Sequence, residues 1–389
     1  MRKGWEYKKL GEVGTFLRGK NILKSDFVEK GLPCIHYGQI HTKFGISTDT
    51  HLTETSQEVY NKAIIASKND VLIAITSEDL EGSCKATAWL GDYDVAVSAH
   101  AAVFKHNLNP KYIVYYLKSQ SFYIEKSKYA RGFKVMEIKP TDIAKIPIPI
   151  PPKSTQLAIV SELDKINELI RLKKEQLKDF DNLAQSLFYE MFGDPVENEK
   201  GWEVKKLNDI SQEIGDGLHG TPEYSDVDTG CFFINGNNLE NGIIVIKDNT
   251  KTVSEKTKAK HYIEMDDFTI LVSINGTLGK VAFYRGENVI LGKSACYIKL
   301  TSYNDKKYIY ELLKSEYFKR YAETECTGTT IRNVSLKSMR NFPIPLPPLP
   351  LQHLFAQRIE QIEHQKSEIQ KAITDLETLL ASRMQYWFE

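Results

Sequence analysis

The sequence predicts a tandem repeat of the α/β (α+β) class, in which two globular domains are each followed by one long helix. The stretch KGWEYKKL around Trp5 returns as KGWEVKKL around Trp202. The proline run KIPIPIPPKSTQ around Pro147 returns as NFPIPLPPLPLQ around Pro343, at nearly the same offset. Because these features recur in the same order along the whole chain, we interpret the sequence as a duplication with two similar folds and two similar sites.

The repeat divides the chain into four consecutive segments. A first domain is expected over residues 1–152 with its helix over 153–195, and a second domain over 196–348 with its helix over 349–389. Between the anchors, the strand-like stretch DVLIAITS of the first copy corresponds to DFTILVSI of the second. A chain of 389 residues with 41% hydrophobic content can bury a core in each of two such domains.

Apolar residues after each proline run alternate in steps of four and three, which is the heptad pattern of a coiled-coil seam. The second copy repeats the first, including an interruption by Lys173 and Lys366. A helix of about 37 residues is near 55 Å long, more than one domain needs to cover a face. Two independent amphipathic helices, each on its own domain, are the alternative. The seam positions are Ile159, Leu163, Ile166, Ile170, Leu177, Phe180, Ala184, Leu187 and Met191, then Phe355, Ile359, Ile362, Ile369, Ile373, Leu376, Leu380 and Trp387.

The proline runs indicate extended, stiff chain, because proline lacks an N–H and restricts the residue before it. We interpret each run as a strut between a domain and its helix, with a ligand for a proline-binding domain as the alternative. Gly193 and Pro195 then end the first helix. Mutual burial of the seams predicts an antiparallel coiled coil with a domain near each end and a pseudo-twofold axis. Such symmetry matches duplex DNA contacted at two half-sites.

Motifs for catalysis or cofactor binding fail their structural tests. GDGLHG, which ends at Gly220, has the GxGxxG spacing, but a turn-rich loop follows it where a helix is required. GENVILGKSA, from Gly286, has one residue too many for a phosphate-binding loop. Cys34, His36 and His41 lie close together but lack a fourth zinc ligand, and the five cysteines form no CxxC pair. We therefore expect non-catalytic domains whose cysteines are mostly small core residues.

The chain has 51 basic and 51 acidic side chains, and this neutral balance is unlike that of a free-standing DNA-binding protein. Residues 1–152 nevertheless carry a net charge of +5. We interpret the positive charge as local, as in KSKYARGFK, with partner subunits supplying more of the phosphate attraction; a solvated surface is the alternative. No apolar run approaches the about 20 residues of a membrane helix and no signal peptide is visible, which predicts a cytoplasmic protein.

Polar side chains suited to base edges occur at matching places in both domains. Asn and Gln can form two hydrogen bonds with adenine, whereas Arg and Lys favour guanine. Glycine-flanked Asn is also a common turn residue, so a turn role is the alternative at each position. The candidate DNA-binding residues are Lys20, Gln39, Arg131 and Lys134 in the first domain, and His219, Thr221, Asn235, Asn237, Asn238, Thr329, Arg332 and Asn333 in the second.

These repeated passages carry a family resemblance. The paired GWE.KKL openings, GTTIRNVSLKSMRNFPIPLPPLPLQ, its weaker partner GFKVMEIKPTDIAKIPIPIPPKSTQ and the helices after them resemble the specificity subunit of type I restriction-modification systems. The resemblance covers essentially the whole chain. It implies two target recognition domains, each reading one part of a split sequence in double-stranded DNA, and paired helices that act as a spacer. In the first copy GFKVMEI replaces GTTIRNV, so Val135, Met136 and Ile138 are alternatively buried core.

The resemblance also implies which partners complete the complex. The helices would dock two methyltransferase (modification) subunits, which methylate adenine with S-adenosylmethionine. Restriction subunits, which combine a motor with a nuclease, would use ATP and magnesium. This chain itself would hold no cofactor, no metal and no active site. A stand-alone nuclease or methyltransferase, and a coiled-coil scaffold with two protein-binding heads, are the alternatives.

Overall fold

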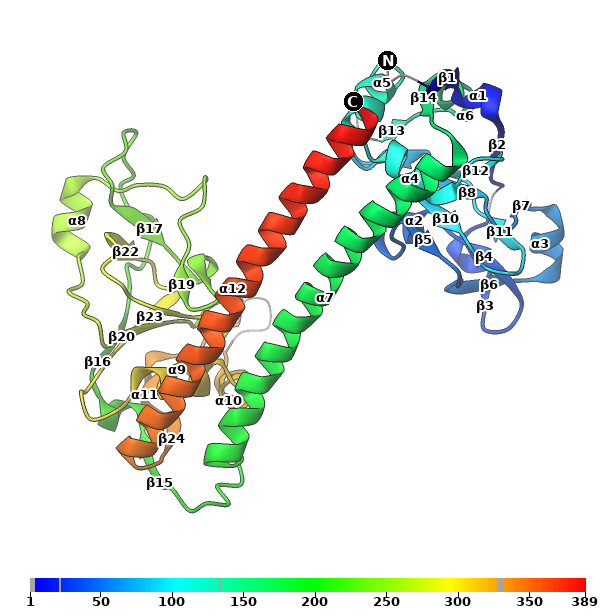
Figure 1. Ribbon diagram of the computed structural model, residues 1–389. Helices are drawn as coiled ribbons and strands as arrows, with labels where there is room; N and C mark the ends of the chain where they lie inside the picture. Colours follow the sequence, from blue (N-terminus) through cyan, green and yellow to red (C-terminus); the bar gives the residue numbers. More distant parts are fainter. Residues whose placement is uncertain (1–3, 21, 133–134, 328–331) are drawn as a thin grey trace. The chain divides into compact units, whose positions relative to one another are not determined.

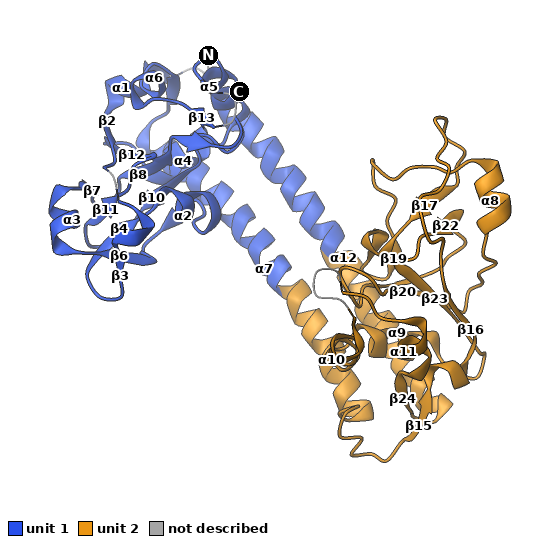
Figure 2. Ribbon diagram, turned by 180° about the vertical axis from the view of Figure 1, so that it is seen from behind, with its two compact units in different colours: residues 1–175, 370–389 blue, residues 176–369 orange. Residues whose placement is uncertain are grey.

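The computed structural model describes residues 4–20, 22–132, 135–327 and 332–389. The chain separates into two compact units (Figure 2): unit 1 contains residues 1–175 and 370–389, and unit 2 contains residues 176–369. This division differs from the four consecutive segments expected from the sequence. Each unit holds one globular domain, the start of one long helix and the end of the other.

Unit 1 is built on two five-stranded sheets (Figure 1). In the first, β8 and β10 are fully buried, and neighbouring strands are antiparallel except for β10 and β5. Its order is β2 (Gly14–Arg18), β12 (Ala101–His106), β8 (Val71–Ala74), β10 (Ala86–Trp89) and β5 (Ser47–Thr48). The second sheet contains one parallel pair, β4 with β11. Its order is β3 (Phe27–Val28), β6 (Thr53–Thr55), β4 (Leu32–Ile35), β11 (Val95–Val97) and β7 (Ile64–Ala66).

Short helices and two-stranded ribbons complete unit 1. The ribbons pair β1 (Glu6–Lys9) with β14 (Pro147–Ile150), and β9 (Thr76–Ser77) with β13 (Met136–Glu137). The helices are α1 (Leu10–Val13), η1 (Lys24–Asp26), α2 (Tyr37–Thr42), α3 (Gln57–Lys62), α4 (Pro110–Leu117), α5 (Gln120–Ser127) and α6 (Pro140–Ile143). Helix α4 packs on β8 and β10 with a row of buried tyrosines, so the core lies between this helix and the first sheet.

Unit 2 repeats this architecture. Its antiparallel sheet has the order β16 (Ser211–Asp216), β23 (Ala295–Leu300), β20 (Thr269–Ser273) and β21 (Val281–Phe283), which corresponds to β2, β12, β8 and β10. The parallel pair β17 (Phe232–Ile234) and β22 (Val289–Leu291) corresponds to β4 and β11. The duplication read from the sequence is therefore confirmed at the level of strand order.

The other elements of unit 2 are small. The ribbons pair β15 (Glu203–Lys206) with β24 (Pro343–Leu346), and β18 (Leu239–Glu240) with β19 (Ile243–Ile244). The helices are η2 (Leu207–Ile210), η3 (Gly236–Asn238), α8 (Glu255–His261), α9 (Lys306–Lys314), α10 (Glu316–Glu325) and α11 (Leu336–Asn341).

The two sequence anchors of the repeat pair with each other. Strand β1, from KGWEYKKL, lies antiparallel to β14, from the first proline run, and β15 lies in the same way against β24. Each proline strand has one ladder neighbour, which suits a residue that cannot donate a hydrogen bond. The Tyr112 hydroxyl donates to the Pro149 carbonyl at 2.7 Å, and Tyr308 does the same to Pro345. The proline runs are thus extended struts that end where the long helices begin.

The long helices α7 (Lys153–Phe192) and α12 (Leu349–Phe388) each have 40 residues, or about 60 Å (Figure 1). In unit 1, the Nη2 atom of Arg383 on α12 donates to Glu162 of α7 at 3.2 Å, while the Lys174 ammonium lies 2.8 Å from the Glu377 carboxylate. Rising numbers on α7 meet falling numbers on α12, so the helices are antiparallel, as the heptad pattern predicts. Despite their length, no helix in the described ranges is apolar enough to cross a membrane.

Unit 2 shows the same antiparallel pairing. Lys366 of α12 lies 2.5 Å from Asp181 of α7, and Arg358 donates to the Met191 sulfur at 3.9 Å. The lysine that interrupts the heptads therefore forms an ion pair between the helices in this unit. Because both units contain contacts between α7 and α12, the alternative of two independent surface helices is wrong.

The last residue of each long helix closes a core. Phe388 of α12 is buried in unit 1, with its ring 5.5 Å from that of Tyr112. Phe192 of α7 is buried in unit 2, 4.8 Å from Tyr308 and 5.0 Å from Phe355. These phenylalanines fall next to the predicted seam positions, because a residue at a helix end faces the domain as well as the partner helix.

Candidate nucleic-acid interface

In each unit a polar surface lies at the carboxyl ends of the parallel strand pair. Gly19 in unit 1 and Gly217 in unit 2 form its floor. A Cβ at Gly19 would lie 2.1 Å from the Ser98 carbonyl oxygen, and a Cβ at Gly217 would lie 1.9 Å from that of Leu291. Only glycine permits such a close approach of two main chains. Lys20, a candidate DNA contact, follows Gly19, pairs with Ser98 through the backbone, and is exposed.

An amide side chain holds the turn beside this floor in both units. The Gln39 Oε1 atom accepts a hydrogen bond from the His36 backbone N–H at 3.1 Å. In the same way, the Asn238 Oδ1 atom accepts from the Asn235 backbone N–H at 3.0 Å, and its amide also donates to the Val245 carbonyl at 2.9 Å. Asn238 is only 8% exposed. Gln39 and Asn238 therefore position the turn, which supports the turn role weighed for these residues.

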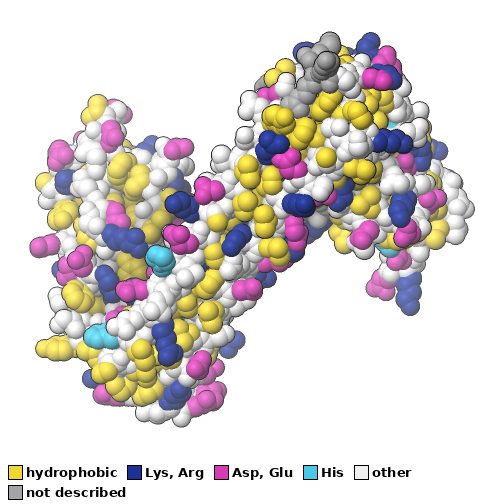
Figure 3. Space-filling view, viewed as in Figure 1, with side chains coloured by type: hydrophobic (Ala, Val, Ile, Leu, Met, Phe, Trp, Pro, Cys, Tyr) yellow, Lys and Arg dark blue, Asp and Glu magenta, His cyan; other side chains and the backbone are white. Residues whose placement is uncertain are grey.

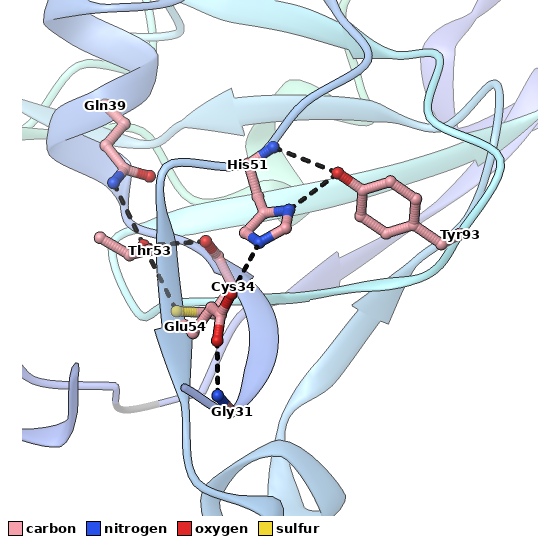
Figure 4. A network of polar contacts seen from close by, with 7 residues as sticks. All are labelled: Gly31, Cys34, Gln39, His51, Thr53, Glu54 and Tyr93. Atoms are coloured by element: carbon pink, nitrogen blue, oxygen red, sulfur yellow. Dashed lines mark hydrogen bonds and ion pairs between the residues drawn. The ribbon is translucent and has the colours of Figure 1, made fainter. Parts of the chain in front are cut away.

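Figure 4 shows the hydrogen bonds around the Gln39 side chain. Its amide donates to the Thr53 hydroxyl at 3.2 Å, and that hydroxyl donates to the Cys34 carbonyl at 2.9 Å. Burial raises the pKa of the Cys34 thiol, which itself donates to Thr53. Glu54, the next residue after Thr53, forms a separate contact with His51, 3.5 Å away. Within the described ranges, no three His, Cys, Asp or Glu side chains are grouped as a metal site would require.

A hairpin borders the surface of unit 1. Arg131 and Glu137 exchange backbone hydrogen bonds of 3.1 and 2.8 Å at its base. The Arg18 guanidinium lies 2.8 Å from the Glu137 carboxylate, and Arg131, which is 69% exposed, lies 3.8 Å from Asp142. Arg18 is a cation that the sequence analysis missed, although it directly precedes Gly19 and Lys20. Lys134 lies outside the described residues.

The corresponding hairpin of unit 2 has the same base. Thr327 and Asn333 exchange backbone hydrogen bonds of 2.9 and 3.1 Å, and Asn333 also bridges to Asn275. The Arg332 side chain is exposed and forms a 2.9 Å ion pair with Glu323. Such an exposed pair contributes little to stability, so Arg332 can exchange Glu323 for another anion at low cost. Thr329 lies outside the described residues.

Unit 2 has a cavity of about 440 Å³ beside η3. Asn237 projects at its edge as an exposed side chain, and in the described part of the chain its amide forms no hydrogen bond. The cavity also receives three lysines, Lys247, Lys251 and Lys280. These lysines could not be predicted from the sequence, because they are scattered over 34 positions with no motif spacing. An anionic ligand that presents hydrogen-bonding groups, such as a nucleic acid strand, suits this combination.

The remaining candidates of unit 2 lie around the same turn. Asn235 is half-buried and its Oδ1 accepts from the Ser294 hydroxyl at 3.0 Å. His219 lies two residues after the floor glycine, is exposed, and lies 2.8 Å from the Asp216 carboxylate. Thr221 is exposed in the loop beyond it. In the described ranges no helix directly follows GDGLHG, in agreement with the rejection of a dinucleotide motif.

The basic run KSKYARGFK offers fewer cations for contact with DNA than its charge indicates. Lys126 is buried, with 4% exposure, and donates to the carbonyls of Glu81 and Ser83. Burial lowers the pKa of Lys126. Lys128 pairs with Glu125 at 2.6 Å. The interpretation of this run as local positive charge does not extend to Lys126 as a surface charge, because its ammonium group is buried and donates hydrogen bonds to backbone carbonyls.

The apolar residues of the first hairpin divide between core and surface. Ile138 is fully buried, Met136 is half-buried, and Val135 is 59% exposed. Figure 3 shows acidic and basic side chains mixed over the visible face, without one large basic patch. Local cations at the turn and the hairpin, rather than overall charge, therefore distinguish the candidate surface.

Two copies of one fold, carried by paired helices and each presenting an exposed polar surface at the same end of its parallel strands, define a duplicated DNA-recognition protein. A family model described as the type I restriction modification DNA specificity domain matches residues 2–179 and again residues 199–378. The chain belongs to this family. It is a specificity subunit with two target recognition domains, and its fold is a tandem of two such domains.

Similar proteins support the family assignment. The chain is 22% identical to the type I restriction enzyme MjaVIII specificity subunit of Methanocaldococcus jannaschii, over 97% of this chain and 92% of the relative. It is 23% identical to the EcoKI specificity subunit of Escherichia coli K12, over 96% and 85% of the two chains.

Solved structures show the same fold. A chain from work on complex assembly and conformational transition of the type I R-M system has a TM-score of 0.66 and 18% identity, with 99% of this chain and 97% of that chain covered. The S subunit from M. genitalium has a TM-score of 0.52 and 14% identity, with 99% and 96% covered.

Proposed function

We propose that this specificity subunit reads a split target in double-stranded DNA, with one short block read by each unit. One observation supports this proposal most strongly. The two units share the backbone structure beneath the surface, including the floor glycine and the turn held by an amide side chain, but the exposed side chains on that structure differ. A protein that reads two different blocks with one fold requires this arrangement, because base contacts specify sequence and phosphate contacts fix position.

The exposed candidates are the base and phosphate contacts in this proposal. Lys20 and Arg131 are the proposed DNA contacts of unit 1, and Asn237 and Arg332 are those of unit 2. Asn237 offers the donor and acceptor that adenine requires, whereas the arginines suit guanine or a phosphate. His219, Thr221, Asn235 and Asn333 lie around the same turn and hairpin as secondary contacts, and Gln39 and Asn238 position the turn.

We further propose that the paired helices dock two modification subunits, through which restriction subunits join. Leu169 and Leu172 of α7 are 47% and 46% exposed, which supports a partner on this helix face. In this complex, S-adenosylmethionine belongs to the modification subunits, and ATP and magnesium belong to the restriction subunits. This chain contributes recognition and no catalytic step, and it acts in the cytoplasm.

The test is a map of methylated adenines. The chain is expressed with its modification subunit in a host that lacks adenine methylation, and the genome is sequenced with detection of methyladenine. We expect one motif with two short specified blocks around a gap of fixed length. Methylation of a single uninterrupted motif, or none with a demonstrably active modification subunit, would contradict the proposal.

A further inference from the structure

Unit 1 has a cluster of aromatic and imidazole side chains on the candidate surface. Tyr37, the first residue of α2, has its ring 5.2 Å from that of His100 and 6.1 Å from that of His41. All three are at least partly exposed. His100 has a φ of 66°, in the left-handed region that few non-glycine residues adopt and that often occurs at functional sites.

Unit 2 has small side chains at the equivalent places. The Ile75 N–H donates to the His100 carbonyl at 2.9 Å, and the Ile274 N–H donates to the Ser294 carbonyl at 3.0 Å. Ser294 therefore occupies the position in unit 2 that His100 occupies in unit 1. Tyr37 and Gly236 are each the first residue of the turn that an amide side chain holds, so Gly236 occupies the position equivalent to Tyr37. The cluster is therefore a difference in side chains on a frame that both units share.

The cluster is joined to the proposed DNA contacts on both sides. The Tyr37 N–H donates to the Ser98 hydroxyl at 3.0 Å, and Ser98 pairs with Lys20. The His41 Nε2 atom donates to the Thr76 carbonyl at 2.9 Å, in the strand that pairs with the Arg131 hairpin. The cluster is therefore connected through hydrogen bonds to the segments that carry Lys20 and Arg131.

The hydrogen bonds decide which imidazole can take up a proton. The His36 Nδ1 atom accepts from the Gly38 N–H at 3.2 Å, so protonation of His36 would break the turn. Burial, followed by the charges of Lys24 and His100, lowers the pKa of His36. The His41 hydrogen bond to Thr76 uses Nε2 as the donor, so a proton on Nδ1 would leave this hydrogen bond intact. The His100 side chain is exposed. His41 and His100 can therefore become cationic without loss of a fold contact.

Within the described residues, no ion pair joins His41 or His100 to a carboxylate. Glu137 of β13 is paired with Arg18, Glu54 of β6 with His51, and Asp70 before β8 with Lys105. The other charged groups on or next to the elements around α2 are the cations Lys20, Lys24, Lys43 and Lys85 and the carboxylates Asp26, at the end of η1, and Glu78 and Asp79, directly after β9. A phosphate that approaches the exposed imidazoles favours their cationic form, because an opposite charge stabilises it.

We propose that Tyr37, His41 and His100 form a DNA contact of unit 1 that takes up protons on binding, so that affinity for the block read by unit 1 rises as the pH falls. The inference rests on the proposed function. Unit 2, with Gly236 and Ser294 in place of the ring and the exposed imidazole, has no equivalent dependence at this place.

The test uses the assembled complex of this chain with its modification subunits. Its affinity for a labelled duplex with the full target is measured at pH 6 and pH 8 at one ionic strength. Uptake of about half a proton on average across this range gives about tenfold tighter binding at pH 6. The variant His41→Gln/His100→Ser is expected to bind the target with most of this pH dependence removed. The single variant His100→Ser introduces, at an exposed position, the residue that unit 2 has there. It is expected to lose part of the pH dependence. The control His353→Gln, an exposed histidine of unit 2, keeps it.

Two further duplexes, each with one block scrambled, assign the effect to a unit. Scrambling the block read by unit 1 should abolish the part of the pH dependence that the variants remove, and scrambling the other block should leave it. An unchanged pH dependence in His41→Gln/His100→Ser would overturn the inference. A complex that does not prefer the target over scrambled DNA at any pH would instead refute the proposed function.

Discussion

At the scale of single residues, neighbouring asparagines illustrate two roles that the sequence does not separate. Asn237 and Asn238 both occur in FINGNNLENG, yet Asn238 is buried and its amide is bound on both sides, whereas Asn237 is exposed at the cavity. The difference is set by the direction of each side chain from the 3₁₀ turn of η3. Position along the chain is therefore a weaker guide to a base contact than burial and hydrogen bonding.

Substitution of the two asparagines by alanine should separate the roles. Asn238→Ala should lower the free energy of unfolding by about 1–3 kcal/mol, because the Val245 carbonyl and the Asn235 N–H lose their partner. Asn237→Ala should leave stability unchanged and weaken discrimination at one base pair by about 1–3 kcal/mol. Urea denaturation and competition binding with single-base variants of the target measure the two effects. Equal loss of stability in both variants would contradict the assignment.

At the scale of elements, each long helix is fixed at both ends by duplicated contacts. Gln156 at the start of α7 donates to the Pro151 carbonyl at 2.9 Å, and Gln352 at the start of α12 donates to the Pro347 carbonyl at 2.8 Å. The far ends are fixed by Phe192 and Phe388, which enter the cores. Both ends of each helix are therefore anchored in the unit that contains them.

Removal of a helix-end ring should test this element directly. Phe388→Ala should lower the free energy of unfolding by about 3–5 kcal/mol, because a buried ring is replaced by a cavity. Leu379→Ala, on an exposed side chain of the same helix, is the matched control and should cost far less. Thermal and urea denaturation are the measurements. A similar effect of the two substitutions would mean that Phe388 does not anchor α12.

The helix pair should also give unit 1 a defined pH dependence. Hydrogen bonding from Arg383, supported by Trp387, holds the pKa of Glu162 below its ordinary value. The charged carboxylate therefore stabilises the folded state above the unfolded pKa of about 4.5, and this contribution is lost as the pH falls through the lowered folded value. Glu162→Gln should be less stable than the wild type at pH 7 and approach it near pH 3. Glu368→Gln, on an exposed part of α12, should show no such convergence.

At the scale of the whole molecule, the sequence predicted the duplication, the extended proline runs and the antiparallel helices, because these depend on periodicity and local chemistry. It did not predict that the KGWE and proline segments pair with each other, since strand partners distant in sequence leave no periodic signal. Nor did it identify Arg18 or the cavity lysines, which only the packing of separate strands brings to one surface. Buried Lys126 was misread for the same reason.

The central claim is that each unit reads its own block of a split target. The most direct measurement replaces residues 1–152 with the corresponding domain of another specificity subunit and maps methylated adenines with the same modification subunit. We expect one block of the motif to change while the other block and the length of the gap remain. A change in both blocks, or in neither, would contradict independent reading by two units.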